Sequence, residues 1–156
     1  MISLMNKAHL TAISRKKLSA PMAWLEKEGI FDGIPPHKRL DYGCGKGYDA
    51  DALSMQKYDP FYFKCDDFCA GEFHIITCNF VLNVIESAEE RQRVLDNIER
   101  WLMPGMTAFI TIRSDKDKLK GYTTKGTWQG YVPPNLPLFH KGHGYEMYAL
   151  KKGYES

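Results

Sequence analysis

The stretch LDYGCGKGYDA, from Leu40 to Ala50, places three glycines at alternate positions directly after a short apolar segment. Glycine is favoured where a backbone must turn sharply or approach a ligand closely. We therefore predict a strand over 38–42, a tight loop at 43–47 and a helix over 48–55. Such a loop lies at the carboxyl end of its strand, where open α/β sheets bind their ligands.

Three kinds of glycine loop that hold phosphates or cofactors compete for these residues. A phosphate-binding P-loop needs Gly, four residues and then Gly-Lys-Ser/Thr, but Leu40 occupies the first position and Gly47 follows Lys46. The dinucleotide-binding fingerprint needs a third glycine three residues after the second, and Tyr48 stands there. The remaining pattern, Asp-x-Gly-x-Gly-x-Gly, begins at Asp41.

Strand and helix patterns alternate on both sides of the loop. Strands are expected over 57–63, 73–80, 107–113 and 144–152. A helix capped by Ser19 is expected to end near Gly29. The clearest helix covers 87–103, because Ser87 and Glu90 form a capping-box pattern and Pro104 follows its last apolar positions. This alternation predicts an α/β fold with a mostly parallel sheet.

The composition excludes several classes of protein. The 156 residues fit one domain, and 44% hydrophobic with 26% charged residues is ordinary for a folded chain. A net charge of +2 does not indicate binding to nucleic acid or membrane through bulk charge. There is no long apolar run for a membrane span and no signal-peptide pattern at the start. The four cysteines favour a reduced, cytoplasmic setting over a disulfide scaffold.

With these residues in view, the sequence resembles the class I S-adenosylmethionine-dependent methyltransferases. LDYGCGKGYDA is similar to motif I of that family, and Asp59 lies 18 positions after Asp41, near the expected acidic end of the second strand. FHIITCNFVLNVI, at 73–85, resembles the fourth strand with its following loop, and 102–112 resembles the turn and fifth strand. The resemblance covers residues 38–113. It is nearest to small bacteriophage-type methyltransferases and to those associated with DNA phosphorothioation.

The resemblance implies a three-layer α/β/α Rossmann-like methyltransferase fold in abbreviated form, with an antiparallel last strand. We expect one domain, with a basic arm at 1–18, a cofactor-binding core at 38–113 and a shortened substrate side at 114–156. The implied cofactor is S-adenosylmethionine. The residues expected to bind it are Arg15, Asp41, Gly43, Cys44, Gly45, Gly47, Asp59, Pro60, Asp66, Asp67, Phe68, Asn79 and Phe80.

Some of these residues have specific implied roles. Asp41 is expected to hold the charged amino end of the cofactor, and Asp59 to accept its ribose hydroxyls. Asp66 and Asp67 are expected near the adenine amine, with Phe68 or Phe80 packed on the adenine ring. No catalytic residue is assigned, because methyl transfer needs alignment of the reactants more than a dedicated nucleophile.

Two features depart from the family's pattern. His74 replaces the aspartate with which the fourth-strand motif usually begins. A full third strand and a crossover helix barely fit in residues 60–72, so we predict that this helix is missing or reduced to a turn.

The methyl acceptor stays open between a small molecule, RNA and protein. Amino-methylating enzymes of nucleic acids carry an Asn/Asp-Pro-Pro-aromatic tetrad, whereas residues 79–82 are Asn-Phe-Val-Leu. Cysteine-dependent methylation of cytosine carbon uses a Pro-Cys pair, but Thr77 precedes Cys78. Direct DNA methylation is therefore disfavoured unless a partner supplies recognition. Asn83 is a candidate for contact with cofactor or substrate, or for a loop cap.

Several further segments carry open alternatives. Residues 121–131 either cover a ligand or form a hairpin with Trp128 in the core, and Arg113 either attracts an anionic substrate or pairs with Asp115. The cysteines at 65 and 69 and the histidines at 140 and 143 have permissible metal spacing, but no metal site is predicted.

Two other functions compete with methyl transfer. One is a catalytically inactive module that binds the cofactor or docks to a partner. The other is an enzyme that degrades S-adenosylmethionine without an acceptor.

Overall fold

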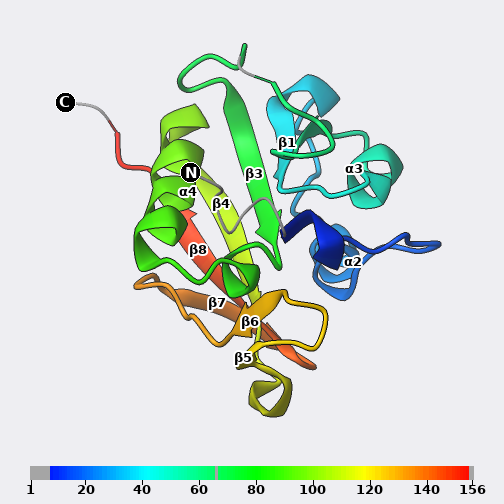
Figure 1. The fold of residues 1–156 in the computed structure, drawn as a ribbon. Coiled ribbons are helices and arrows are strands. Elements are labelled where there is room, and N and C mark those ends of the chain that lie inside the picture. Colours follow the sequence, from blue (N-terminus) through cyan, green and yellow to red (C-terminus); the bar gives the residue numbers. More distant parts are fainter. Residues whose placement is uncertain (1–7, 66, 155–156) are drawn as a thin grey trace.

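The fold is built on a six-stranded sheet, seen in a computed structural model that describes residues 8–65 and 67–154 (Figure 1). The strand order is β2-β1-β3-β4-β8-β7. The strands are β1 (Arg39–Tyr42), β2 (Gln56–Tyr58), β3 (Phe73–Asn79), β4 (Leu102–Arg113), β7 (Leu138–Gly142) and β8 (Tyr145–Lys151).

The sheet is mostly parallel, as predicted. The pairs β1–β2, β1–β3 and β3–β4 are parallel, while β8 is antiparallel to both β4 and β7. Helix α3 (Tyr48–Ala52) connects β1 to β2 and helix α4 (Ala88–Trp101) connects β3 to β4, whereas β7 and β8 form a hairpin across two residues. The antiparallel last strand is thereby confirmed.

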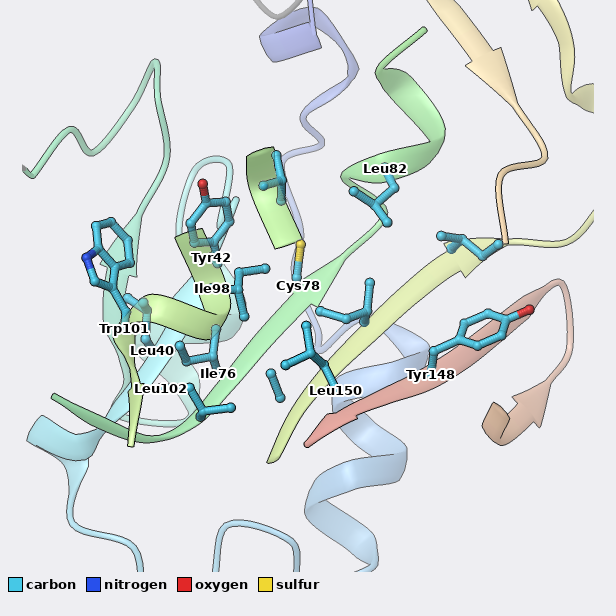
Figure 2. Packing of buried hydrophobic residues seen from close by; sticks show 14 of the residues in the cluster. Leu40, Tyr42, Ile76, Cys78, Leu82, Ile98, Trp101, Leu102, Tyr148 and Leu150 are labelled. Atoms are coloured by element: carbon cyan, nitrogen blue, oxygen red, sulfur yellow. The ribbon is translucent and has the colours of Figure 1, made fainter. Parts of the chain in front are cut away.

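Helices cover both faces of the sheet, which confirms the α/β/α layering (Figure 1). Helix α4 (Ala88–Trp101) packs on one face, where Ile76 and Cys78 of β3 meet Ile98 (Figure 2). Helices α2 (Ala20–Lys27) and α3 (Tyr48–Ala52) cover the other face, onto which Ile75 points. Successive side chains of a strand alternate between faces, so β3, whose residues 75–78 are buried, contributes apolar side chains to both faces.

Short elements complete the chain. They are the 3-10 turns η1 (His9–Thr11), η2 (Pro36–Lys38), η3 (Leu82–Val84) and η4 (Lys116–Lys118), and a hairpin of β5 (Lys120–Tyr122) with β6 (Trp128–Gly130). The segment 121–131 does form a hairpin, as one of the two alternatives predicted, but without Trp128 in the core. Trp128 is half-buried, and its ring lies where a Cβ atom on Gly130 would be.

The segment between β2 and β3 is reduced further than the sequence predicted. Its described residues contain no helix, which confirms the prediction, and no strand beyond an isolated bridge between Asp59 and Phe63. Phe68 fills part of this gap, because its ring packs edge-on against Phe73 and Trp101. With the third strand gone, the three-residue β2 becomes an edge of the sheet.

Two local predictions need correction. Pro104 and Gly105 do not end the long helix, because α4 stops at Trp101 and β4 already begins at Leu102. The residue before a proline is biased toward extended backbone, which explains the early strand. Ser19 precedes α2 but makes no side-chain cap on it; its hydroxyl instead donates to Asp49 Oδ2 at 2.6 Å.

The described helices include none with the length and apolar character needed to cross a bilayer.

The packing of α4 yields a test of the core. Ile98 is fully buried against the sheet, so Ile98→Ala should lower the free energy of unfolding by about 2–5 kcal/mol through lost contacts and a residual cavity. Urea denaturation measures this loss, with Glu99→Ala, on the exposed side of the same helix, as the control. Equal stability of the two variants would contradict the packing described.

Candidate functional site

A cavity of about 670 Å³ lies at the carboxyl ends of β1, β3 and β4. The glycine loop forms one wall, the segment after β3 forms another, and residues from the arm at 8–15 lie over it. Figure 1 shows the N-terminal turn η1, in dark blue, beside the end of β3. Cavities of this size accommodate small molecules and cofactors.

The glycine loop turns tightly because its glycines adopt positive φ angles. Gly43 has φ +77°, and a Cβ atom there would lie 2.3 Å from Val81 Cγ2. The amides of Gly43 and Cys44 both donate to the carbonyl oxygen of Tyr58, at 2.7 and 3.0 Å. Gly47, with φ +89°, leads into α3. The loop is therefore fixed to the end of β2 at its start and left open toward the cavity.

Asp59 joins the loop to the segment that follows β2. Its Oδ2 accepts the amide of Gly45 at 2.8 Å, and its Oδ1 accepts the amides of Phe61 and Tyr62 at 2.9 and 3.0 Å. A carboxylate oxygen has two lone-pair sites, so Oδ1 is fully used by its two amides and Oδ2 can accept one further donor. Asp59 and Pro60 both line the cavity. The Asp59 carboxylate therefore holds the glycine loop in place and also faces the cavity.

Asp41 is a buried carboxyl group at the bottom of the cavity. It is 4% exposed, and its Oδ1 accepts the hydroxyl of Thr77 at 2.9 Å. Burial raises the pKa of Asp41 to about 7, although the Thr77 hydrogen bond acts in the opposite direction. Asp49 and Asp59 add smaller upward contributions to this pKa.

Asp49 lies in the first turn of α3 and is held from across the site. The amide and hydroxyl of Ser19 donate to its two carboxylate oxygens, at 2.9 and 2.6 Å. The Asp49 carboxylate therefore occupies the start of this five-residue helix. The Ser19–Asp49 contacts tie the start of α2 to the glycine loop.

The segment after β3 presents polar groups without protein partners. Both side-chain polar atoms of Asn79 are buried and unpaired among the described residues, as is Oδ1 of Asn83. Asn83 Nδ2 donates to Gln129 Oε1 at 3.0 Å. Phe80 has φ +60°, a conformation that costs free energy for a bulky residue and that clusters at functional sites. All four side chains line the cavity.

The N-terminal arm lies across the mouth of the site. The ring of His9 stacks on Phe61 with centroids 3.8 Å apart. Lys46 Nζ donates to Ser14 Oγ at 3.1 Å, and the Tyr48 hydroxyl donates to the carbonyl of Lys16 at 3.0 Å. These contacts fix the arm to both the glycine loop and the segment after Asp59.

Most of the residues expected at the site meet in this one cavity. Those that line it are Arg15, Asp41, Gly43, Cys44, Gly45, Gly47, Asp59, Pro60, Asn79 and Phe80. Asp67 and Phe68 are not among the lining residues, and Phe68 packs in the core next to Trp101. Asp66 lies outside the described residues.

Other cavity residues were not expected from the sequence. Gln129 stands in a segment for which two alternatives were open, and Asp49, although inside the stretch similar to motif I, was given no role. His143 and Asp117 line the end of the cavity nearest β4. No motif marks these two residues as part of the site. Asp117 lies in the connection after β4, and His143 lies in the turn between β7 and β8.

The remaining sequence candidates lie as follows. The guanidinium of Arg113 pairs with Asp115, through Nε to Oδ1 at 2.9 Å and a second, shorter contact. His140 stacks on Trp24 with centroids 3.6 Å apart. His74 is near the amino end of β3, opposite the cavity. In the ranges that the structure covers, no cluster of His, Cys, Asp or Glu is arranged to hold a metal, and the four cysteines are free.

Comparison with known proteins extends the description of the fold. No protein-family profile matches the sequence, and no curated protein matches it. A proposed type 11 methyltransferase from Sulfolobus solfataricus matches in structure with a TM-score of 0.59, at 15% identity, over 89% of this chain and 95% of that one. SibL, an S-adenosylmethionine-dependent methyltransferase in its apo form, gives 0.51 at 12% identity, over 84% of this chain and 56% of SibL.

A third solved structure is an S-adenosylmethionine-dependent methyltransferase from Mesorhizobium loti, with a TM-score of 0.45 at 12% identity over 67% of this chain. This chain spans 61% of the length of that protein and 56% of SibL. The match to the Sulfolobus protein, nearly complete for both chains, shows that this chain has a Rossmann-like methyltransferase fold.

The buried carboxyl group predicts a specific pH dependence of stability. The pKa of Asp41 is about 7 in the folded chain and 3.8 as its ordinary value. Its favourable contribution is therefore present below about pH 4 and is lost as the pH rises through 7. Asp41→Asn should remove this loss, on the order of a few kcal/mol between pH 4 and 8. Urea denaturation at both pH values measures it.

A second variant checks the cause. Thr77→Val removes the hydrogen bond that lowers the pKa of Asp41, so the loss of stability should move to higher pH. A wild type and an Asp41→Asn variant with the same pH profile would show that Asp41 is not the group responsible.

Proposed function

We propose that the chain binds S-adenosylmethionine in this cavity and transfers its methyl group to an acceptor. The single observation that carries the proposal is the glycine loop, which opens onto the cavity at the carboxyl end of β1 and is bonded to the acidic residue after β2. Open α/β sheets bind their ligands at this edge. The fold shared with a proposed methyltransferase supports the same conclusion.

The lining residues fit this cofactor. Asp41 offers a carboxylate to its ammonium group, and Asp59 Oδ2, which accepts only one amide, keeps a lone pair for a ribose hydroxyl. Arg15 is half-buried in the arm and lines the cavity, so it is suited to the carboxylate. Phe80 offers an apolar ring to the adenine. Both amide atoms of Asn79 and the amide oxygen of Asn83 have no partner among the described residues, so polar groups of a ligand would complete them.

The cofactor supplies a methyl group activated on a positively charged sulfur. The protein's part is to hold the reactants in line and to exclude water, and such alignment accounts for much of the acceleration in favourable cases. The arm contributes to this exclusion, because Ala8, His9, Thr11 and Ala12 lie over the cavity.

The proposal extends to the whole chain. Residues 38–113 hold the cofactor, residues 114–156 form the acceptor side, and the arm covers both. The four free cysteines favour the cytoplasm as its location. The narrower resemblance to bacteriophage-type and phosphorothioation-associated enzymes stays a prediction from the sequence.

Calorimetry with S-adenosylhomocysteine, the demethylated cofactor, tests the binding site. Gly45→Asp places a second carboxylate beside Asp59 and next to the arm, since a Cβ atom there lies 3.4 Å from Ala12 Cβ. We expect binding to weaken at least about tenfold, which corresponds to roughly 1.4 kcal/mol.

The matched control for this substitution is Gly33→Asp. Gly33 also has a positive φ angle, with nothing within 4 Å of an added Cβ atom, and it does not line the cavity. This variant should bind as the wild type does. No binding by the wild type would refute the proposed site.

The charge of the arm gives a second test. Arg15→Gln should weaken binding of S-adenosylhomocysteine severalfold at low salt and less at high salt, because an exposed ion pair is screened by salt. Lys17→Gln is the control, since Lys17 is exposed in the same arm and does not line the cavity. Equal effects of the two variants would exclude a specific role for Arg15.

Turnover is tested with a cofactor labelled in its methyl group. Label that passes into macromolecules or metabolites of a cell extract supports methyl transfer. Breakdown of the cofactor in the absence of any extract would identify a degrading enzyme instead.

A further inference from the structure

The N-terminal arm carries cations that no carboxylate neutralises. Residues 8–17 include Arg15, Lys16 and Lys17 but no acidic residue. Lys16 and Lys17 are exposed, and Arg15 is half-buried. The ion pairs found within residues 8–65 and 67–154 include none of these three side chains. Three adjacent cations without counter-ions create a local positive potential, although the net charge of the whole chain is only +2.

The glycine loop adds a fourth cation to this run. Lys46 is exposed, and its Nζ donates to Ser14 Oγ at 3.1 Å. Because a hydroxyl is neutral, this contact holds the ammonium group beside the arm without cancelling its charge. The Tyr48 hydroxyl donates to the carbonyl of Lys16 at 3.0 Å, so the same stretch of the arm is also held against α3. We call the resulting positive surface the cationic rim of the cavity; its members are Arg15, Lys16, Lys17 and Lys46.

Phe61 is an exposed aromatic residue that lines the same cavity. Its ring stacks on His9, with centroids 3.8 Å apart and 9° between the ring planes, and Tyr62 meets it edge-on. These contacts hold the ring in place, yet 54% of the residue stays exposed. A fixed and exposed aromatic ring is a platform on which the bases of single-stranded nucleic acids stack. Since His9 belongs to the arm, the platform and the cationic rim form one continuous surface.

Three carboxylates lie in the wall of the cavity and not on its outer surface. Asp41 and Asp59 are only 4% and 8% exposed. Asp49 is half-buried and accepts both hydrogen bonds from Ser19. The charges of these groups therefore act on a molecule that enters the cavity, whereas a chain lying across the outer surface meets the exposed lysines.

The charged groups at the end of the cavity nearest β4 balance one another. Asp115 pairs with Arg113, and the exposed Asp117 is followed by Lys118, which also lines the cavity. His143, in the turn between β7 and β8, adds no negative charge. The surplus of positive charge around the cavity thus belongs to the arm and the glycine loop.

We propose that the cationic rim and Phe61 bind a segment of single-stranded RNA, with its phosphates on the rim and one base stacked on Phe61. Positive charge along the backbone combined with an aromatic platform is the usual means of binding a single strand. A duplex fits less well because its base faces are covered, whereas the loops and ends of RNA offer unstacked bases. An acidic polypeptide would use the cations but would leave the exposed ring without a role.

This inference goes beyond the proposed methyl transfer, because it assigns an interaction surface and a class of partner and needs no turnover. Fluorescence anisotropy with the full-length protein and a labelled oligouridine of about twelve nucleotides measures the binding. Four phosphate contacts predict that the logarithm of the association constant falls with the logarithm of the salt concentration with a slope of about −2.8.

The double variant Lys16→Gln/Lys17→Gln tests the cationic rim. It should weaken binding of the oligouridine and make the salt slope shallower by about 1.4, because two phosphate contacts are lost. The matched control is Lys27→Gln/Lys151→Gln, which removes the same charge from exposed positions that do not line the cavity. Equal effects of the two double variants would show that binding follows overall charge, and would overturn the proposed surface.

Substitution of Phe61 tests the aromatic platform. Phe61→Ala should weaken binding of the oligouridine at least about fivefold and leave the salt slope unchanged, because stacking involves no counter-ion release. Phe61→Tyr keeps a ring on which a base can stack and should restore the affinity. An RNA duplex of the same length should bind equally well to wild type and Phe61→Ala, since its bases are not free to stack.

Competing polyanions identify the class of partner. Polyglutamate at the same concentration of charge should displace the oligouridine poorly, and an oligothymidine of the same length should bind no more tightly than the oligouridine. Equally effective displacement by polyglutamate, tighter binding of the duplex or of the oligothymidine, or no binding of the oligouridine would each overturn the proposal.

Calorimetry with S-adenosylhomocysteine separates this inference from the proposed function. The variant Lys16→Gln/Lys17→Gln should bind that ligand as the wild type does, because neither lysine lines the cavity. Binding of RNA without binding of S-adenosylhomocysteine would refute the proposed function and leave the RNA surface standing. The opposite result would refute the RNA surface alone.

Discussion

The architecture of the site depends on the carboxylate of Asp59. One of its oxygens accepts the amide of Gly45 and the other accepts two amides from the turn that follows β2. Charge-assisted hydrogen bonds of this kind are stronger than neutral ones. They join the glycine loop to the segment that replaces the third strand and its helix. Because His9 stacks on Phe61 in that same segment, the position of the arm also follows from this carboxylate.

A feature of the fold could be predicted from the sequence when neighbouring residues determine it, and not when contacts between distant residues do. The glycine loop, the strand at 73–79 and the helix capped by Ser87 follow from short-range patterns and were predicted nearly to the residue. The contacts that hold the arm over the cavity could not be predicted from local patterns, since they join residues more than 30 positions apart. The edge strand β7 was missed, because its exposed Leu138 and Phe139 break the alternation expected of a half-buried strand.

The same distinction applies to the candidate site. Ten of the thirteen expected cofactor residues line the cavity, and all but Arg15 of the arm lie in segments that follow or end strands of the sheet. Phe68 was misplaced for a physical reason: without a crossover helix, its ring is needed to cover Phe73 and Trp101. Gln129 could not be assigned from sequence, since its meaning arises only from the contact with Asn83 across 46 positions.

The absence of the third strand also changes which strand lies at the edge of the sheet and is open to solvent. An exposed edge offers unpaired backbone groups to any passing extended chain, and long apolar edges promote aggregation. The edge that this removal leaves is β2, which has three residues and carries Lys57 paired with Asp51. Both shortness and charge disfavour pairing with a foreign strand. The loss of the third strand therefore leaves β2 at an edge that is protected against self-association.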